Sequence, residues 1–336
     1  MKLGEEKRIR WAAAAVVCAL VLRLFAGGGW GLFVDAITTP EAVAWLFYLE
    51  TGRRITTLYS PQDSAGDGDW GEQTVTTPPK EPDRAVFAPE DAAAVEVQSY
   101  CGYSVDTKAL LTQSLNWDLT EDGPAVLILH SHGTESYTKT EDYTESSGYR
   151  TLNTDYNVVS IGERIARVLE AGGVQVLHDK AMHDYPSYNL SYTQARKSIE
   201  EYLAKYPTIR MVLDIHRDAV ESGGNQISYT VDVQGKKAAQ VMMVVGTDAG
   251  GLIHPKWPEN MALAVKLHAQ LEKNVPGICR PISFRKQRFN QDLSTGALIV
   301  EVGAAGNTRQ EALLAGQLVA ESILDLAYGA TGTELS

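Results

Sequence analysis

Residues 125–136 read AVLILHSHGTES, five consecutive apolar residues that lead directly into two histidines and a glutamate. A short, continuous apolar run is typical of a strand buried on both faces. Similar runs predict further strands at 174–177, 209–215, 241–245 and 297–302, and helical spacing predicts helices at 157–171, 191–206, 260–274 and 309–326. Strands that alternate with helices predict an α/β domain, in which helices flank a mostly parallel, twisted sheet.

Ionisable side chains gather at the ends of three predicted strands. His130, His132 and Glu135 follow the first of these strands, His216 and Arg217 follow the one at 209–215, and Glu301 lies near the end of the last. Because the carboxyl ends of parallel strands meet at one edge of a sheet, these side chains are expected to lie close together. Burying so many charged groups without a metal would be costly.

The chemistry of this set suits zinc. A catalytic zinc ion takes three ligands from histidine and carboxylate side chains and keeps a fourth position open. We therefore predict that His132, Glu135 and His216 bind Zn²⁺. For His130 two roles stay open, a further metal ligand or a residue that orients its neighbour.

Two residues are candidates for the chemistry itself. Zinc acidifies a bound water and polarises a substrate carbonyl, and amide hydrolysis then needs a general base. We predict that Glu301 is this base and that Arg217 stabilises the oxyanion. A plain ion-pair role is the alternative for Glu301.

The N-terminal part of the chain differs from the rest. Four basic residues precede a long apolar run that contains a single charge, Arg23, and such a run is long enough to cross a bilayer as a helix. The basic flank predicts that everything after this anchor lies outside the cytoplasm; a cleaved signal peptide is the alternative. The expected segments are a cytoplasmic tip (1–10), a transmembrane anchor (11–33), a juxtamembrane segment (34–59), a Pro/Gly/Asp-rich linker (60–92) and the catalytic domain (93–330).

The net charge argues against a nucleic-acid-binding protein, and the cysteine spacing excludes a zinc site made of thiolates. The formal net charge of −12, from 42 acidic and 30 basic residues, argues against nucleic acid as a partner. No pair of cysteines has the CxxC spacing of a thiolate zinc site. Cys101 and Cys279 are expected to be unpaired thiols rather than a disulfide.

Four motifs, in order along the chain, resemble the stage II sporulation protein P family. They are VLILHSHGTESYT (126–138), HDYPSYNLSYTQAR (183–196), VLDIHRDA (212–219) and LSTGALIVEVGAAGNT (293–308). The resemblance implies the fold of zinc amidases and a zinc-dependent N-acetylmuramoyl-L-alanine amidase of peptidoglycan, with endopeptidase activity on peptide cross-links. It also implies a role in engulfment during endospore formation, in one membrane complex with the sporulation proteins D and M.

The resemblance also bears on single residues. It implies that His132 and His216 bind zinc and that Glu301 is the catalytic glutamate. In the wider zinc-amidase class the third ligand is a glutamate at the start of the helix that follows the first strand. The corresponding residues here, 155–157, contain no glutamate, so the third ligand stays open between Glu135 and His130. The second motif supplies the candidate substrate-binding residues His183, Tyr188, Asn189 and Arg196.

Two other functions remain as alternatives. A zinc peptidase of the carboxypeptidase type would share the metal chemistry, but it needs a cationic pocket for a terminal carboxylate, whereas an amidase needs an open groove for glycan. A catalytically silent scaffold of a cell-wall complex would have lost a ligand or the base. The sequence retains candidates for both.

Overall fold

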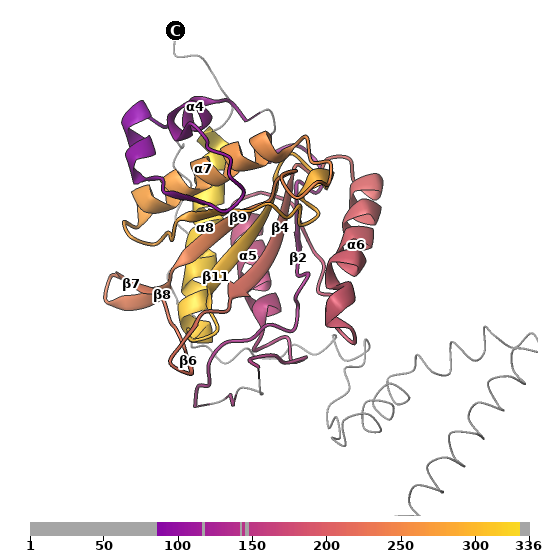
Figure 1. Ribbon diagram of the computed structural model, residues 1–336, viewed down its shortest axis with the longest axis vertical. Coiled ribbons are helices and arrows are strands. Elements are labelled where there is room, and N and C mark those ends of the chain that lie inside the picture. Colours follow the sequence, from indigo (N-terminus) through magenta and orange to yellow (C-terminus); the bar gives the residue numbers. More distant parts are fainter. Residues whose placement is uncertain (1–85, 116–117, 142, 145–147, 330–336) are drawn as a thin grey trace, which may run out of the picture. The chain divides into compact units, whose positions relative to one another are not determined.

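A computed structural model describes residues 86–115, 118–141, 143–144 and 148–329 (Figure 1). The predicted tip, anchor and juxtamembrane segment, and most of the predicted linker, lie outside the described residues. Among the helices that the structure describes, none combines the length and the apolar content that a membrane span requires.

The centre of the domain is a seven-stranded sheet with the strand order β1-β10-β9-β11-β4-β2-β3. All neighbouring strands in this sheet are parallel except β9 and β11, so the sheet is mostly parallel, as predicted. Its strands are β1 (Val97–Ser99), β2 (Val126–Leu129), β3 (Val176–His178), β4 (Met211–Asp218), β9 (Val241–Val245), β10 (Ile282–Phe284) and β11 (Ala297–Ala304). Two small hairpins separate β4 from β9, namely β5 (Glu221–Ser222) with β6 (Asn225–Gln226) and β7 (Thr230–Val233) with β8 (Lys236–Ala239).

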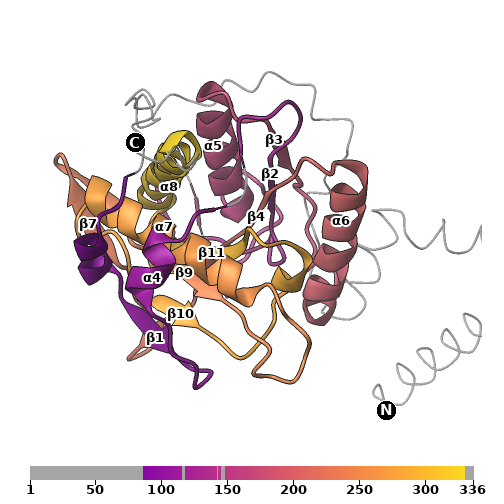
Figure 2. The ribbon, with the colours of Figure 1, turned by 90° about the horizontal axis from the view of Figure 1, so that it is seen from above.

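Helices cover both faces of the sheet, and the period-two alternation of the strands decides which side chain meets which helix. In β2, Val126 and Ile128 belong to the large core that includes α5, α7 and α8, whereas Leu127 and Leu129 pack in a smaller core with α6. Figure 2 shows α6 apart from the other three long helices. The helices are α4 (Thr107–Thr112), α5 (Val158–Ala171), α6 (Ser191–Lys205), α7 (Trp257–Asn274) and α8 (Arg309–Gly329), with short 3-10 turns η2 (Pro89–Ala94), η3 (Tyr188–Leu190) and η4 (Gln291–Leu293).

The structure differs from the sequence-based prediction in several places. Strand β4 runs to Asp218, so His216 and Arg217 lie within the strand rather than after it. Two strands, β1 and β10, were not predicted, because three residues are too few to display a period. Cys101 and Cys279 are free thiols, as expected.

Candidate active site

The candidate site lies on the face of the sheet that α6 covers, near the ends of β2, β4 and β11. In β4, Leu213 and Ile215 belong to the large core, so Asp214 and His216 point to the opposite face. Glu301 of β11 is the direct partner of His216 across the parallel pair. The general base and one metal ligand predicted from the sequence are therefore neighbours on the same face.

Three side chains form a possible metal centre. One ligand atom each from His132, Glu135 and His216 can be chosen so that all three lie within 4.8 Å of one another. Atom Nδ1 of His132 lies 3.5 Å from Oε1 of Glu135, and Nδ1 of His216 lies 3.5 Å from Oε2. A tight turn after β2 brings the first two together, with the Glu135 amide donating to the carbonyl of His132. Two imidazoles and one carboxylate are a donor set that fits zinc.

Asp214 fixes the orientation of His216. Its Oδ1 atom lies 2.9 Å from Nε2 of His216, and its carboxylate also accepts bonds from the amide and the hydroxyl of Ser131, each 2.7 Å long. Burial alone would lower the pKa of His216, but the negative charges of Asp214 and Glu135 outweigh it and raise that pKa well above its usual value. Nδ1 is thus the ring nitrogen that faces the other two ligands.

Glu135 carries its negative charge in a buried position. Burial alone would raise its pKa, but hydrogen bonds from His132 and His216 and the positive charge of Arg217 hold the pKa well below the usual value. The backbone amide of Arg217 also donates to Oε2, at 3.2 Å. The carboxylate is therefore ionised and held in place before any metal binds.

The pKa of Glu301 is shifted in the opposite direction to that of Glu135. Its Oε2 atom is buried and has no hydrogen-bond partner among the described residues. Burial raises the pKa of Glu301 to about 8; the positive charge of His216 opposes this shift, and the negative charges of Glu135 and Asp218 add to it. A carboxyl group beside a candidate metal site, with one oxygen unpaired among the described residues, has the properties of a proton acceptor and donor.

Arg217 points away from this face, because side chains alternate along β4. Its guanidinium donates to the carbonyl of Ser136 at 2.9 Å and to that of Tyr149 at 2.8 Å, and its Nη1 lies 3.6 Å from Oε1 of Glu135. The Arg217 side chain therefore holds the segment after β2 in place through two hydrogen bonds, and its positive charge stabilises the carboxylate of Glu135. Its oxyanion role stays a prediction.

Both ring nitrogens of His130 have partners outside the group of candidate ligands. Its Nδ1 lies 3.0 Å from the carbonyl of Ile215, and its Nε2 lies 2.9 Å from Nε2 of His178. Burial, with the neighbouring His178, lowers the pKa of His130 to about 3, so the ring is neutral. Both ring nitrogens are occupied, which favours Glu135 as the third ligand.

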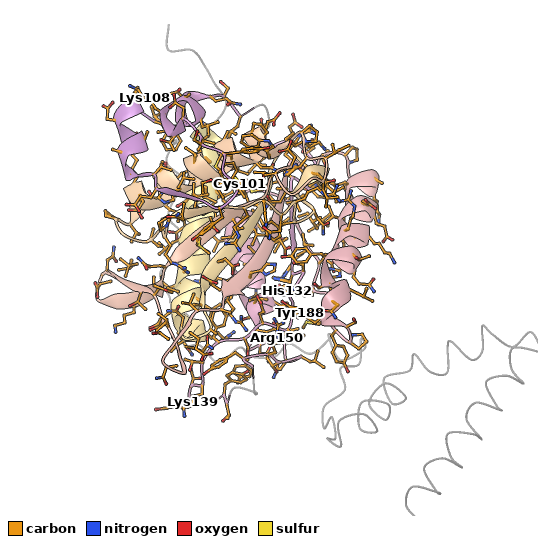
Figure 3. The ribbon with its side chains drawn as sticks, viewed as in Figure 1. Cys101, Lys108, His132, Lys139, Arg150 and Tyr188 are labelled. Atoms are coloured by element: carbon orange, nitrogen blue, oxygen red, sulfur yellow. The ribbon has the colours of Figure 1, made fainter. Side chains whose placement is uncertain are left out.

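The four candidate substrate-binding residues occupy different surroundings. The ring of Tyr188 stacks on that of His132 with centroids 4.6 Å apart, and the Arg150 guanidinium lies 4.7 Å from the centre of the Tyr188 ring. Figure 3 shows the three residues together beside the lower end of α6. Asn189 is exposed beside Tyr188. His183 is buried and lies 3.3 Å from Asp179, whereas Arg196 forms two 3.0 Å bonds with Asp292. Tyr188 is thus the one of the four that contacts a candidate ligand, and the substrate role of all four stays a prediction.

Sequence reasoning missed three residues of the site. Asp214 and Ser131 hold His216, and the ring of Tyr192 meets that of His132 edge-on at 5.4 Å. Counting in twos from His216 along the predicted strand would have placed Asp214 on the same face. No comparable signal marks Tyr192, which reaches the site from the first turn of α6.

A His-Glu-His group that could hold a metal ion, next to a carboxyl with an unpaired oxygen among the described residues, is the arrangement expected of metal-dependent hydrolases. The chain belongs to the stage II sporulation protein P family, whose model matches residues 64–324. A curated relative, stage II sporulation protein P of Bacillus subtilis (strain 168), is 27% identical over 222 residues, which are 63% of this chain and 53% of the relative. The match thus spans about half the length of that relative.

Two solved structures are similar to the chain at low identity. One is the N-acetylmuramoyl-L-alanine amidase AmiC2 of Nostoc punctiforme, with 16% identity, 61% of this chain and 97% of that chain covered, and a TM-score of 0.37. The other is the N-acetylmuramoyl-L-alanine amidase from Clostridium difficile 630, with 15% identity, 61% and 94% covered, and a TM-score of 0.39.

Proposed function

We propose that this domain is a peptidoglycan hydrolase that cleaves the amide bond between N-acetylmuramic acid and L-alanine, and that it acts in wall remodelling and engulfment during endospore formation. Membership of the stage II sporulation protein P family supports the biological role. The observation that carries the chemistry is the group formed by His132, Glu135 and His216, next to which Glu301 holds a buried, unpaired oxygen.

Zinc is the metal that we propose for this site, with His132, Glu135 and His216 as its ligands. When bound, it supplies a polarised carbonyl and an acidified water. Glu301 takes the proton of the attacking water at its free oxygen and passes it to the nitrogen that leaves when the amide bond breaks. Its raised pKa lies close to neutral pH, so both the charged form that accepts the proton and the protonated form that donates it are accessible. Ser131 and Asp214 keep His216 in the required orientation.

The test is the variant Glu301→Gln, which keeps the shape of the side chain and removes its ability to accept a proton. Purified sacculi are digested, and the soluble products are analysed by mass spectrometry. Intact stem peptides are expected from the wild type and from the control Glu259→Gln, which changes an exposed residue of α7. Glu301→Gln is expected to lose at least about 100-fold in rate, the size of a general-base contribution.

The same digestion separates the alternatives. A carboxypeptidase would release single terminal amino acids and leave the stem peptides attached, and a silent scaffold would release nothing. Undiminished cleavage by Glu301→Gln would remove the assigned mechanism. Metal content measured on the same preparations tests zinc, because substitution of His216 is expected to abolish stoichiometric binding.

We further propose, from family membership and from the apolar N-terminal run, that the domain works outside the cytoplasm on a membrane anchor, together with the sporulation proteins D and M. An added endopeptidase activity belongs to the same proposal. Co-purification of the three proteins from membranes tests the complex. Digestion of purified cross-linked muropeptide dimers tests the endopeptidase activity.

A further inference from the structure

The two candidate histidine ligands are held in different ways. A metal-binding histidine usually donates the N–H of its other ring nitrogen to a carboxylate or a carbonyl, which fixes the orientation of the ring. His216 has such a partner in Asp214, at 2.9 Å. For the ring of His132, the described part of the chain provides only the 3.5 Å contact between Nδ1 and Glu135, which is itself a candidate ligand. Before any metal binds, the packing of its ring therefore has to orient His132.

Two tyrosines pack against the His132 ring. Tyr188 stacks on it, with ring centroids 4.6 Å apart and an angle of 20° between the ring planes, and Tyr192 meets it edge-on at 5.4 Å. Tyr188 is 52% exposed, whereas the side chain of His132 is only 12% exposed. The Tyr188 ring thus covers this ligand and limits the rotation of its imidazole.

An exposed tyrosine keeps one position only when another group holds it, and Arg150 does so for Tyr188. The guanidinium carbon of Arg150 lies 4.7 Å from the centre of the Tyr188 ring, which is a cation–π contact (Figure 3). Atom Nη1 of the same guanidinium donates to Asp184 at 2.7 Å and to the hydroxyl of Thr134 at 3.0 Å. The Asp184 side chain is fully buried, so this charged hydrogen bond fixes the position of the guanidinium.

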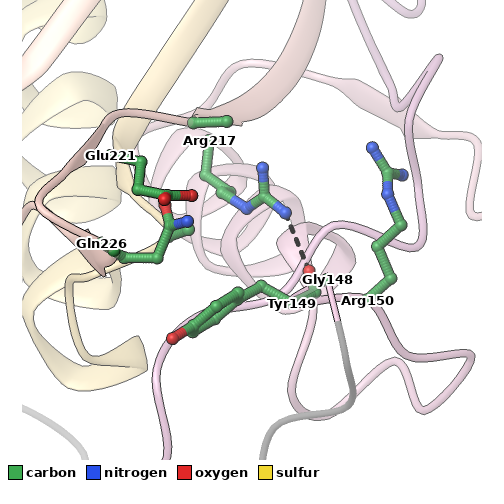
Figure 4. A pocket seen from close by; sticks show the side chains of 9 residues that line it. Gly148, Tyr149, Arg150, Arg217, Glu221 and Gln226 are labelled. Atoms are coloured by element: carbon green, nitrogen blue, oxygen red, sulfur yellow. Dashed lines mark hydrogen bonds between the residues drawn. The ribbon is translucent and has the colours of Figure 1, made fainter.

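The backbone of Arg150 is fixed as well. Glu135 and Arg150 form an antiparallel β-bridge, so the two segments that carry them are paired. The carbonyl of Tyr149 accepts a 2.8 Å bond from Arg217, and Figure 4 shows the side chains of Tyr149 and Arg150 extending to opposite sides of their segment. Arg150 therefore extends from a fixed segment of the chain to its contact with Tyr188.

We propose that Tyr188 is a positioning residue for the candidate zinc ligand His132, and that Arg150 holds Tyr188 in the stack. Both contacts described for Tyr188 are made by its ring, so its hydroxyl is not required. This role differs from substrate binding, which was predicted for Tyr188 from the second motif. The inference rests on the proposed function, because it concerns one ligand of the proposed zinc site.

Zinc affinity tests the inference without catalysis. The metal-free full chain is titrated with zinc in competition with a chromophoric chelator at fixed pH. Tyr188→Leu keeps an apolar side chain but removes the ring, and it is expected to raise the zinc dissociation constant about 5-fold, the size of one stacked aromatic pair. Tyr188→Phe keeps the ring and is expected to retain the wild-type value.

Tyr100→Leu is the matched control. Tyr100 is also an exposed tyrosine with an arginine over its ring, since the guanidinium carbon of Arg285 lies 4.8 Å from the ring centre. It directly follows β1, which three strands separate from β4 in the sheet. Its replacement is expected to leave the zinc dissociation constant unchanged, and circular dichroism establishes that each variant is folded.

A double-mutant cycle tests the contribution of Arg150. Arg150→Gln alone is expected to weaken zinc binding, both through Tyr188 and through its own 3.4 Å contact with Glu135. In the Tyr188→Leu background the effect of Arg150→Gln is expected to be smaller, because the stack is already lost. Equal effects in the two backgrounds overturn the role assigned to Arg150.

The remaining outcomes separate this inference from the proposed function. Zinc affinity in Tyr188→Leu equal to that of the control overturns the inference, and so does a Tyr188→Phe variant that binds zinc as weakly as Tyr188→Leu. Slower release of stem peptides from sacculi by Tyr188→Leu at unchanged zinc affinity assigns Tyr188 to the substrate, and leaves the amidase function standing. Weaker zinc binding by Tyr188→Leu, in a chain whose wild type releases no stem peptides, supports the inference and removes the amidase function.

Discussion

Replacing Asp214 by Asn should weaken zinc binding without changing any metal ligand. The Asn side chain can keep the two contacts of Oδ1, with the Ser131 amide at 2.7 Å and with Nε2 of His216 at 2.9 Å. Its amide nitrogen then faces the Ser131 hydroxyl, which can turn to accept. What is lost is the negative charge, which strengthens the bond to His216 and makes Nδ1 a better donor to metal.

The size of the effect follows from this comparison. A hydrogen bond to a charged group contributes about 1 kcal/mol more than a neutral one, and the loss of such an outer partner weakens metal binding by about 10-fold or more. We therefore expect the zinc dissociation constant of Asp214→Asn to rise about 10-fold. Ser131→Ala, which removes the hydroxyl and keeps the backbone amide, should have a smaller effect.

The assay is competition with a chromophoric zinc chelator at fixed pH, with circular dichroism to establish that each variant is folded. Asp122→Asn serves as the matched control, because Asp122 is exposed and lies outside the site. An affinity for zinc in Asp214→Asn equal to that of the control would refute the view that this carboxylate orients His216.

Three further outcomes are expected. His130→Asn should retain stoichiometric zinc and Glu135→Gln should lose it, as measured by metal analysis; the reverse result would make His130 the third ligand. Chelation should lower the thermal midpoint of the wild type and added zinc should restore it, because a ligand that binds only the folded state stabilises it. Lys266→Met should raise the free energy of unfolding at pH 7 by about 2 kcal/mol, because burial lowers the pKa of Lys266 to about 8 and the cost of protonating the buried amine exceeds what is lost with its bond to the carbonyl of Leu111. That gain should shrink as pH rises from 8 toward 10.5 in urea titrations, and a gain independent of pH would contradict it.

The main elements of the fold could be predicted from the sequence because their patterns are strong. The run at 125–129 became β2, and the helical spacing at 157–171 became α5, which begins after the N-cap Asn157. The direction of β9 could not be predicted, since it depends on the chain path through the hairpins after β4 and not on the residues of β9 itself. Apolar periodicity reports burial and carries no information on strand direction.

Most residues of the candidate site could also be predicted from the sequence, but the position of Arg217 could not. His132 and Glu135 follow β2, His216 and Glu301 are paired within β4 and β11, and the structure brings the four residues together. The position of Arg217 was misjudged because it was treated as a loop residue. Once β4 extends through it, alternation sends its side chain to the face opposite that of His216.

Glu135, the proposed third ligand, comes before residues 155–157 in the sequence but lies beside the start of α5 in space. The wider amidase class places its ligand glutamate at the start of the helix after the first strand, and here that helix is α5. The carbonyl of Glu135 accepts a 2.8 Å bond from the amide of Val158, the first residue of α5, and Ser136 pairs with Asn157 beside it. Glu135 therefore reaches the start of the helix from the preceding segment, and it is the proposed source of the glutamate that residues 155–157 lack. A site defined by its geometry can thus keep the same ligand type when another stretch of chain provides it.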